Sequence, residues 1–551
     1  MAKYFRPYLT LVAFSILIWS ACRTRTEHDR DRVFYYNESN GITSLDPAFA
    51  RDIEVMWATN QLFDGLVELD SALQIVPCIA KSWDISSDGL LYTFHLRTDV
   101  FFHRSPCFPD SSPRRVNAYD FVYSFQRILD PKVASPGSWI FASVDTSHAT
   151  GFQAIDDTTL AIHLKERFEP FLGILSMQYC NVVPHEAIDY FGKEFRSHPV
   201  GTGAFQFFHW MEDVALVLHR NDHYWMRDQQ GRSLPYLDAV KIDFVKDMTV
   251  EYQGLIQGRY DFMSGIHPAF KDEILTSDGE LKSSMQSKLK FQKVPFVKTD
   301  YLGWYVDEQS GANVNSPWLL PKIRRAISCA IQKEKMIRYL RNNTVFIANE
   351  GFIPPVLNPA DTMLYNSFSL QQAEQLLSEA GYPHGENLPP LVISCTSDYT
   401  DLMEFIQHDL KQIGVEVQIQ VLQGPALREQ SAKGQLSMFR KSWLADYPDA
   451  ENFLTVFASS SFCPAGPNYT HYRNPTFDAL YASCRTETNP QQRRRLFAEM
   501  NAMLMEDCPI IPLYYDQVSH FVRHEVQGLQ TNPLNMIDLR TVYKMTSHAQ
   551  D

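Results

Sequence analysis

The 551-residue sequence predicts an α/β protein in which helices cover a mostly parallel β-sheet. The main observation is that helical and strand patterns of apolar residues alternate regularly after residue 296. Composition is the second observation, because 45% hydrophobic and 13% aromatic residues are enough for a large core. The length suggests about three or four domains. The sequence contains no internal repeat and no low-complexity segment.

The first strongly patterned region predicts a β-hairpin followed by a helix. Residues 87–89, Ser-Asp-Gly, form a tight-turn signal because glycine readily adopts the positive φ that such turns need. Residues 92–96 then alternate apolar and polar side chains, which is the period-two pattern of a half-buried strand. Asn117 is placed to cap the next helix with Asp120 as its capping-box partner, and Pro131 ends that helix.

Strand and helix patterns continue to the C-terminus. A helix running into a strand is predicted for residues 55–69. Further strands are predicted at residues 214–220, 237–245, 302–306, 391–394 and 415–421. Further helices are predicted at residues 252–261, 317–331, 370–380 and 402–413. Ser316 is the predicted cap of the helix that begins at Pro317, and a junction falls near Pro295. The glycine turn at residues 199–205 is followed by Gln206 in place of a third glycine, which excludes a dinucleotide site.

The N-terminus has the pattern of an export signal. Lys3 and Arg6 precede an apolar run at residues 8–19, which is too short to span a bilayer. Small residues before Cys22 resemble a bacterial lipobox, so we expect residues 1–21 to be removed and Cys22 to be lipidated. Residues 22–32 would then form a charged tether. The alternative is an ordinary cleaved signal followed by an incidental cysteine.

Charge and cysteine usage restrict the classes of function. The net charge of −14 becomes −16 when the two basic residues of the signal are removed, which argues against nucleic-acid binding. Eight cysteines remain besides Cys22, and none has zinc-ligand spacing. Cys463 and Cys484 bracket a loop and are a candidate disulfide, whereas Cys329 is predicted to be a buried free thiol. We therefore expect no metal and no cofactor.

Three consecutive motifs resemble those of one protein family. They read QIVPCIAKSW at residues 74–83, SSDGLLYTFHLR at residues 86–97 and DFVYSFQRILDP at residues 120–131. The same order of motifs is typical of the solute-binding proteins of bacterial ABC importers for oligopeptides, dipeptides and nickel, known as family 5. The segment IRRAISCAIQKEKMI at residues 323–337 is also similar to a segment of that family.

The resemblance implies a periplasmic-binding-protein-like fold of type II, with two lobes and a third domain inserted in the N-terminal half. Lobe one is expected to comprise residues 33–66, 199–295 and 513–545. The additional domain is expected at residues 67–198 and lobe two at residues 296–512. Crossing strands near residues 294–302 and 510–515 would join the two lobes.

The resemblance also assigns a ligand site to the segment from Arg440 to Asp449, which reads RKSWLADYPD. Relatives have a similar G-W-x-A-D-Y segment whose aspartate holds the α-ammonium group of a bound peptide, and this role falls on Asp446. Trp443 belongs to the same motif. Ser442 and Leu444 align with positions that bind the ligand through backbone groups alone, and Ile53 is expected opposite them on a second backbone-pairing strand. For Asp446 the alternative is a surface turn residue before Tyr-Pro.

The partner of a ligand carboxylate stays open at this point. Arg440 aligns with a residue that holds the carboxylate in some relatives, and a structural arginine at the rim is the alternative. A basic residue that other relatives use for this purpose is replaced here by Asp398 or Tyr399. The preferred length of the ligand therefore stays open as well.

The predicted function is capture of peptides outside the cytoplasm, in the periplasm or cell envelope, for delivery to the permease of an ABC importer. We expect a monomer that reaches the membrane through its lipid anchor only. Two different functions stay open, namely the same fold binding a nickel chelate or another small solute, and a ligand sensor that feeds no transporter. No HExxH, GxSxG or P-loop motif supports an enzyme.

Overall fold

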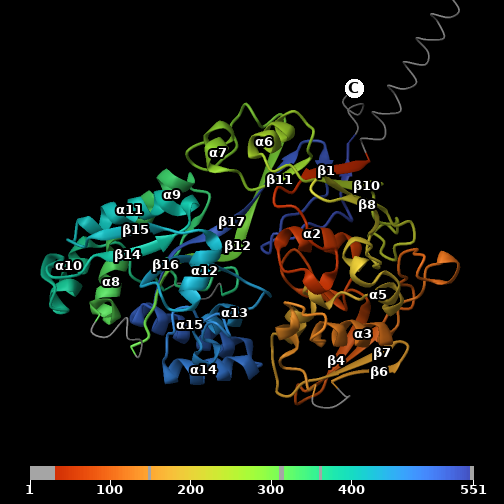
Figure 1. Cartoon of the computed structure of the whole chain (residues 1–551), viewed down its shortest axis with the longest axis horizontal. Coiled ribbons are helices and arrows are strands. Elements are labelled where there is room, and N and C mark those ends of the chain that lie inside the picture. Colours follow the sequence, from red (N-terminus) through yellow and green to blue (C-terminus); the bar gives the residue numbers. More distant parts are fainter. Residues whose placement is uncertain (1–31, 147–150, 309–315, 359–362, 546–551) are drawn as a thin grey trace, which may run out of the picture.

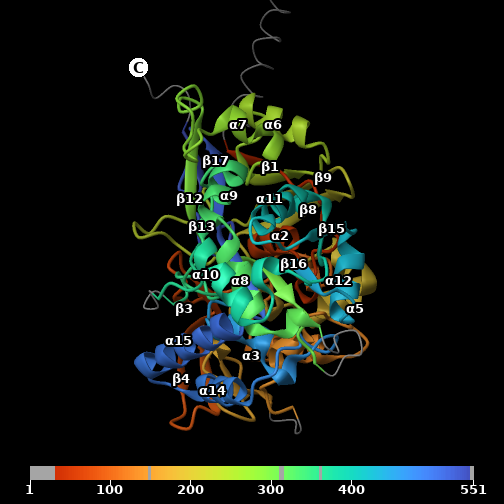
Figure 2. The same cartoon turned by 90° about the vertical axis from the view of Figure 1, so that its left-hand side faces the viewer.

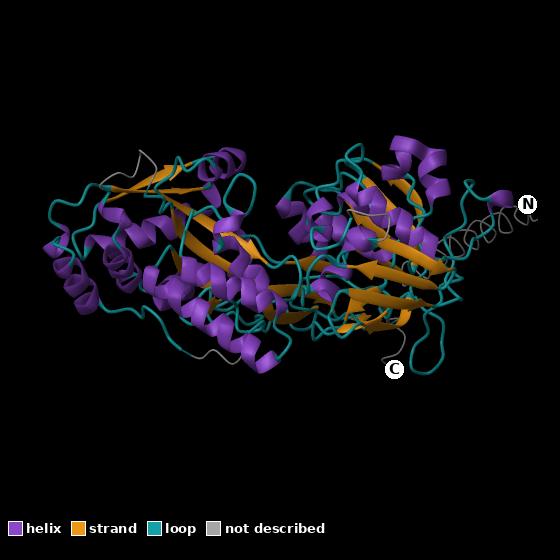
Figure 3. Ribbon diagram, turned by 90° about the horizontal axis from the view of Figure 1, so that it is seen from below, coloured by secondary structure: helices purple, strands orange, loops and turns teal. Residues whose placement is uncertain are grey.

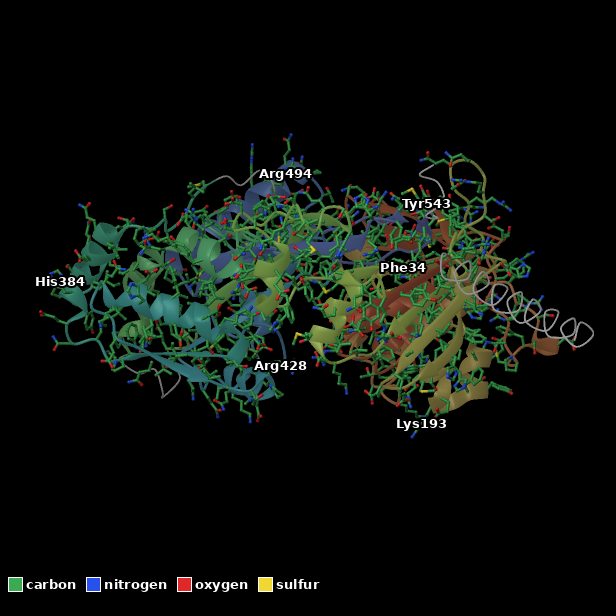
Figure 4. All side chains as sticks on the ribbon, turned by 90° about the horizontal axis from the view of Figure 1, so that it is seen from above. Phe34, Lys193, His384, Arg428, Arg494 and Tyr543 are labelled. Atoms are coloured by element: carbon green, nitrogen blue, oxygen red, sulfur yellow. The ribbon has the colours of Figure 1, made fainter. Side chains whose placement is uncertain are left out.

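The computed structural model describes residues 32–146, 151–308, 316–358 and 363–545. The predicted signal peptide, Cys22 and the tether up to residue 31 lie outside the described residues. In the part of the chain that is described, no helix is long and apolar enough to cross a membrane. The molecule consists of two bodies side by side, with β12 (Leu289–Trp304) and β17 (Ile510–Arg523) between them (Figure 1). His384 lies at the far end of one body, and Tyr543 lies on the other (Figure 4).

One large mixed sheet runs through both bodies. Its strands follow the order β15-β14-β16-β12-β17-β11-β1-β10-β9-β8, and β13 also pairs with β17. Four neighbouring pairs are parallel, namely β14 with β15, β14 with β16, β1 with β10 and β1 with β11. The other pairs in this sheet are antiparallel. The α/β class is therefore correct, but the prediction of a mostly parallel sheet is wrong.

Two long strands, β12 (Leu289–Trp304) and β17 (Ile510–Arg523), connect the bodies. They are antiparallel neighbours, and their register is interrupted between Pro295 and Thr299. The part of β12 before the interruption pairs with residues 517–523, and the part after it pairs with residues 510–515. Strands pass from one body to the other at this waist (Figure 3). The predicted junction at Pro295 therefore lies inside a continuous strand, and the strand predicted to begin at Leu302 begins thirteen residues earlier.

The body that contains the N-terminal half carries one end of the sheet. Its strands there are β1 (Val33–Asn37), β8 (Phe205–Met211), β9 (Ala215–Arg220), β10 (Ala239–Asp243) and β11 (Phe262–Ser264). Its helices include α2 (Ile53–Leu62), α6 (Met248–Ile256) and α7 (Pro268–Ile274). Two small antiparallel pairs complete it: β2 (Val67–Leu69) with β3 (Ile75–Pro77), and β18 (Val526–Gln527) with β19 (Tyr543–Lys544). The helices α6 and α7 lie at the opposite end of the molecule from α14 (Pro475–Thr486) and α15 (Pro490–Asp507) (Figure 2).

A separate four-stranded antiparallel sheet lies in the same body. It consists of β4 (Ala80–Ile85), β5 (Leu91–Leu96), β7 (Thr159–His163) and β6 (Phe152–Asp156), in that order. The helices around it are α3 (Ala118–Leu129), α4 (Phe171–Leu175) and α5 (His185–Phe191). The predicted capping box is present, because the Asn117 side chain accepts from the Asp120 amide and Asp120 accepts from the Asn117 amide. The predicted hairpin and helix are thus confirmed.

The second body surrounds the other end of the large sheet. Its strands are β13 (Phe346–Ile347), β14 (Leu391–Cys395), β15 (Val417–Val421) and β16 (Met438–Leu444). Its helices are α8 (Pro321–Ala330), α9 (Lys333–Arg341), α10 (Leu370–Glu379), α11 (Thr400–Lys411), α12 (Gly424–Ala432), α13 (Glu451–Leu454), α14 (Pro475–Thr486) and α15 (Pro490–Asp507). Ser316 and Pro317 begin a short 3₁₀ turn, and the α-helix predicted to start there starts at Pro321 instead.

All cysteines in the described residues are free thiols. The candidate disulfide between Cys463 and Cys484 is therefore wrong. The Cys463 thiol is directed at the carbonyl of Gly466, and the Cys484 thiol is directed at the carbonyl of Tyr481, so each sulfur is engaged within its own turn of the chain. Cys329 is a fully buried free thiol in the core of the second body, as predicted. The residue ranges assigned to two lobes and an additional domain stay a prediction.

Candidate ligand-binding site

Strand β16 carries four of the predicted site residues and pairs with β12 along its whole length. The Ala445 amide donates to the Val297 carbonyl at 3.0 Å, immediately beyond the pair formed by Leu444 and Lys298. In an antiparallel pair, residues alternate between those that bond to the partner strand and those whose amide groups point away from it. Because Ala445 bonds to the partner, the backbone groups of Ser442 and Leu444 point away from β12.

The other edge of β16 is open where those groups emerge. Strand β14 lies on that side but pairs only with Met438 and Phe439. From residue 440 to residue 444, no strand of the described chain lies against this edge. An edge with unpaired amide and carbonyl groups is able to accept an additional extended strand. The geometry of Ser442 and Leu444 is thus suited to backbone pairing with a ligand.

Ile53 lies on the opposite body, but not on a strand. The segment before it forms a short 3₁₀ turn at residues 47–49, and Ile53 is the first residue of α2. The predicted second backbone-pairing strand is therefore wrong. Pro47 begins the 3₁₀ turn, and Asp52 is the N-cap residue of α2, so this segment forms helical turns instead. The first amide groups of a helix have no acceptor within it. Ile53 can accordingly offer a single backbone donor, rather than a strand edge.

A cavity of about 240 Å³ separates these elements, and we call it the α2 cavity. Ile53, Met56 and Arg51 line it from one body, while Leu444 and Asp446 line it from the other. The structure thus brings three of the predicted residues to one cavity between the two bodies.

Asp446 follows β16 and is held by Asn452, a buried residue of α13. The Asn452 side-chain oxygen accepts from the Asp446 amide at 3.1 Å, and its NH₂ group donates to the Asp446 carboxylate at 3.3 Å. The same oxygen accepts from the indole nitrogen of Trp443 at 3.1 Å. Asn452 therefore fixes both Trp443 and Asp446. Sequence reasoning missed it, because an asparagine six residues after the aspartate carries no distinctive signal.

The electrostatics of Asp446 favour a cationic partner. Its side chain is open to the cleft, yet no described lysine, arginine or histidine forms an ion pair with it. Desolvation by the surrounding protein raises the pKa of Asp446 to about 6, and the hydrogen bond from Asn452 opposes that rise. A carboxylate that is partly desolvated and has no ion-pair partner gains more from binding a positive group than a carboxylate in open water does.

Arg440 lies away from this carboxylate. The Arg440 guanidinium forms an ion pair with Asp300, a buried residue of β12. The central carbon of the guanidinium, Cζ, lies 3.2 Å from the centre of the Tyr399 ring. Desolvation lowers the pKa of Arg440 to about 10. Neither the α2 cavity nor the cavity described next includes Arg440 or Ser442 in its lining. The geometry therefore favours the structural role for Arg440, because its charge already has a partner.

A second cavity, of about 540 Å³, lies on the other side of Asp446. We call it the aromatic cavity, because rings line it from both bodies, namely Trp139, Phe168, Trp443, Tyr447 and Tyr481. Glu451 is buried in its wall and accepts hydrogen bonds from the hydroxyl groups of Tyr447 and Tyr481. Sequence reasoning missed this cavity, because its walls come from segments about 300 residues apart.

Comparison with known families decides the class of the chain. The model of the bacterial extracellular solute-binding proteins, family 5, matches residues 74–462, which is more than half of the chain. The chain belongs to this family. The matched range begins at the first of the motifs described above and extends past the segment that contains Asp446. The resemblance predicted from the sequence is thus confirmed, and family 5 consists of solute-binding proteins that act outside the cytoplasm.

Curated relatives match this family 5 protein over almost its entire length. The periplasmic oligopeptide-binding protein OppA of Escherichia coli is 28% identical, over 92% of this chain and 91% of its own. Heme-binding protein A of Haemophilus influenzae is 27% identical, over 93% of this chain and 92% of its own. The dipeptide-binding protein DppE of Bacillus subtilis is 25% identical, over 93% and 91%. The relatives therefore share one architecture but bear the names of different ligands.

Solved structures agree with the fold. The ABC transporter-associated periplasmic binding protein DppA from Helicobacter pylori, in complex with the peptide STSA, has a TM-score of 0.76 and 26% identity. The match covers 94% of this chain and 100% of that chain. HbpA2 from Haemophilus parasuis has a TM-score of 0.77 at 23% identity, over 93% of this chain and 99% of its own. The predicted periplasmic-binding-protein-like fold class is confirmed.

Proposed function

We propose that this protein captures peptides between its two bodies and delivers them to the permease of an ABC importer. The observation that carries the proposal is Asp446, a carboxylate without an ion-pair partner among the described residues, at the end of an open strand edge. A peptide offers an ammonium group and an extended backbone, and the two features of the site match these two groups. The relatives named for oligopeptides and dipeptides support the same ligand class.

The proposed binding mode adds one extended strand to the edge of β16. The ligand pairs with the outward amide and carbonyl groups of Ser442 and Leu444, accepts from the Ile53 amide, and places its ammonium group at Asp446. The Trp443 side chain lies on the face of β16 opposite to the side chains of Ser442 and Leu444. It supports the Asp446 carboxylate through Asn452. Main-chain bonds supply affinity without regard to sequence, whereas side-chain cavities supply preference.

Closure follows from the position of these contacts on both bodies. A ligand that touches Ile53 and Leu444 together stabilises only the arrangement in which the two are close, so binding shifts the population toward that arrangement. We propose that the bodies correspond to lobe one with the additional domain, at residues 33–295 and 513–545, and lobe two, at residues 296–512. The interruption of β12 between Pro295 and Thr299 is the proposed hinge.

The test of this function compares one short peptide with its N-acetylated form. Titration calorimetry of Ala-Ala-Ala with protein stripped of co-purified ligand should give saturable binding, and acetylation should weaken it at least about tenfold because it removes the ammonium charge. Equal affinity for the two forms would exclude Asp446 as the ammonium anchor. Failure of both forms to bind would contradict the peptide-binding function.

The pH dependence of this binding should report the pKa of Asp446. Only the ionised carboxylate attracts an ammonium group, so affinity for the free peptide should be highest at about pH 7 and fall as the pH drops through about 6. Affinity should also fall above about pH 8, because the peptide α-amine loses its proton there. The Asn452→Ala substitution removes a donor to the ionised form, so the fall should begin at higher pH in this variant. Calorimetry at several pH values measures both. A pH-independent affinity would contradict the assignment.

A second candidate ligand is a non-peptide solute. It is favoured by the relative named for haem, which covers nearly the whole chain at a similar identity to the peptide-binding relatives. Two further candidates are binding of a nickel chelate and ligand sensing without transport. Mass spectrometry of ligand released from protein purified from its native host identifies the ligand class. A haem or metal chelate in place of peptides would favour a non-peptide solute.

We also propose that Cys22 is lipidated and anchors the protein to a membrane. Small residues precede it, and a basic segment and an apolar run of about a dozen residues precede those. The protein produced in bacteria should incorporate labelled palmitate and partition into detergent, and Cys22→Ser should abolish both. Release of the wild-type protein without label would contradict the anchor. A Cys329→Ser variant serves as the matched control, because that buried thiol lies in the folded core.

A further inference from the structure

Asp446 borders both the α2 cavity and the aromatic cavity. The carbon that carries the ammonium group of a peptide also carries its first side chain and its backbone. If the ammonium group binds Asp446 and the backbone follows β16 past Leu444, the backbone occupies the α2 cavity. The first side chain then has the aromatic cavity on the other side of the carboxylate. This inference rests on the proposed function.

We propose that the aromatic cavity binds the first side chain of the ligand, and that it selects a large aromatic side chain with a hydrogen-bonding tip, such as tyrosine or tryptophan. Its volume of about 540 Å³ exceeds what an alanine methyl group can fill. Five aromatic rings form much of its wall, and Trp139 is 43% exposed there, which is a large exposed fraction for an indole. Rings gain from packing against other rings beyond the area they bury.

One polar group in the aromatic cavity lacks a partner among the described residues. The hydroxyl of Ser143 is buried, its residue is only 7% exposed, and no hydrogen bond to it is present. A buried polar group without a partner is costly, so it marks the place where a ligand group is expected. A phenol hydroxyl or an indole N–H that enters between the rings can supply the missing bond.

The charged groups around the aromatic cavity are already paired. Glu451 accepts from two tyrosine hydroxyls. Arg485 forms an ion pair with Glu166 at 3.2 Å, and its carbonyl accepts from the Glu169 amide at 2.9 Å. Besides Asp446, no charge among the described lining residues is free to attract an oppositely charged side chain. A neutral aromatic side chain therefore fits the walls better than a lysine or an aspartate side chain does. Either charged side chain would lose hydration without gaining an ion pair.

The contacts of Arg485 join the two bodies at the aromatic cavity. Glu166 and Glu169 belong to the body that contains α3, whereas Arg485 ends α14 in the other body. The Arg485 guanidinium lies 4.9 Å from the centre of the Phe168 ring. Tyr447 packs into the hydrophobic core of that same body. The walls are therefore formed only when the two bodies are together, which links occupancy of the aromatic cavity to closure.

The experiment measures the affinity of tripeptides X-Ala-Ala by calorimetry, with alanine, leucine, phenylalanine, tyrosine or tryptophan as X. Tyrosine or tryptophan should bind about ten- to hundredfold more tightly than alanine, the range expected for burying an aromatic side chain. The series Ala-X-Ala is the control and should show a smaller gain. Equal affinities within the first series, or an equal gain in both series, would overturn the inference while leaving the proposed function intact. If no peptide binds, both fail.

The Ser143→Ala variant tests the polar contact. Loss of one hydrogen bond should reduce the ratio of the affinities for Tyr-Ala-Ala and Phe-Ala-Ala by about two- to tenfold, with the phenylalanine peptide little affected. A purely structural effect would weaken both peptides alike and leave the ratio unchanged, which would overturn the role of Ser143. The matched control is Ser459→Ala, because the Ser459 hydroxyl also lacks a partner but does not line the aromatic cavity.

Discussion

The Asp446→Ala variant should lose about ten- to hundredfold in affinity for a free short peptide, since a charge-assisted contact contributes roughly 1.5–3 kcal/mol. The Asp446 side chain opens to the cleft, the surrounding protein raises its pKa to about 6, and no described residue forms an ion pair with it, so an ammonium group is the partner that its surroundings favour. The wild-type chain should therefore bind most tightly at a pH where Asp446 is ionised and the peptide amine is protonated. Titration calorimetry at about pH 7 measures the difference.

The acetylated peptide makes this prediction specific. Because it has no ammonium group, Asp446→Ala should change its affinity much less than that of the free peptide. The Asp84→Ala variant is the matched control, since Asp84 is 79% exposed on the four-stranded sheet and lies outside both cavities. An equal loss for free and acetylated peptides would mean that Asp446 acts on the structure of the site and not on the ammonium group.

Local patterns predicted the fold well wherever neighbouring residues determine the structure. Asn117 and Asp120 form the expected capping box, and residues 92–96 form the expected strand with its apolar side chains buried. The errors arose where pairing between strands that are far apart in the sequence determines the structure. A junction was predicted near Pro295, but Pro295 lies inside β12, because pairing with β17 keeps the strand extended on both sides of it. The prediction of a mostly parallel sheet was wrong for the same reason, because the long strands β12 and β17 pass between the bodies in opposite directions.

In the candidate site too, local features were predicted and tertiary contacts were missed. The motif around Trp443 and Asp446 was visible in the sequence, and the alternation of β16 explains why Ser442 and Leu444 are suited to backbone contacts. The partner of Arg440 was not visible, because Asp300 precedes it by 140 residues and only the pairing of β12 with β16 brings them together. Geometry of this kind comes from tertiary contacts, for which a single sequence carries no local signal.

The glycine turn at residues 199–205 holds the C-terminal end of α2, the helix that begins with Ile53. The Gly203 amide donates to the Leu62 carbonyl at 2.9 Å, so the last carbonyl of the helix has a partner. The Gly201 carbonyl accepts from the His103 amide at 2.7 Å. This close approach leaves no room for a side chain, since a Cβ atom at Gly201 would lie 1.9 Å from the Leu62 oxygen. The glycines of this turn thus support a helix rather than a nucleotide.

The Gly201→Ala variant should therefore be destabilised by about 3 kcal/mol or more, the upper part of the range for overpacking, because the obstructing atom belongs to the backbone. Relief requires α2 to move, so affinity for the free peptide should fall as well. A lower urea midpoint by circular dichroism and weaker binding by calorimetry measure the two effects. Gly424→Ala is the matched control, because no atom lies within 4 Å of a Cβ atom there and α12 favours alanine. Unchanged stability of Gly201→Ala would mean that the turn does not support α2, and the coupling from this turn to Ile53 would fail with it.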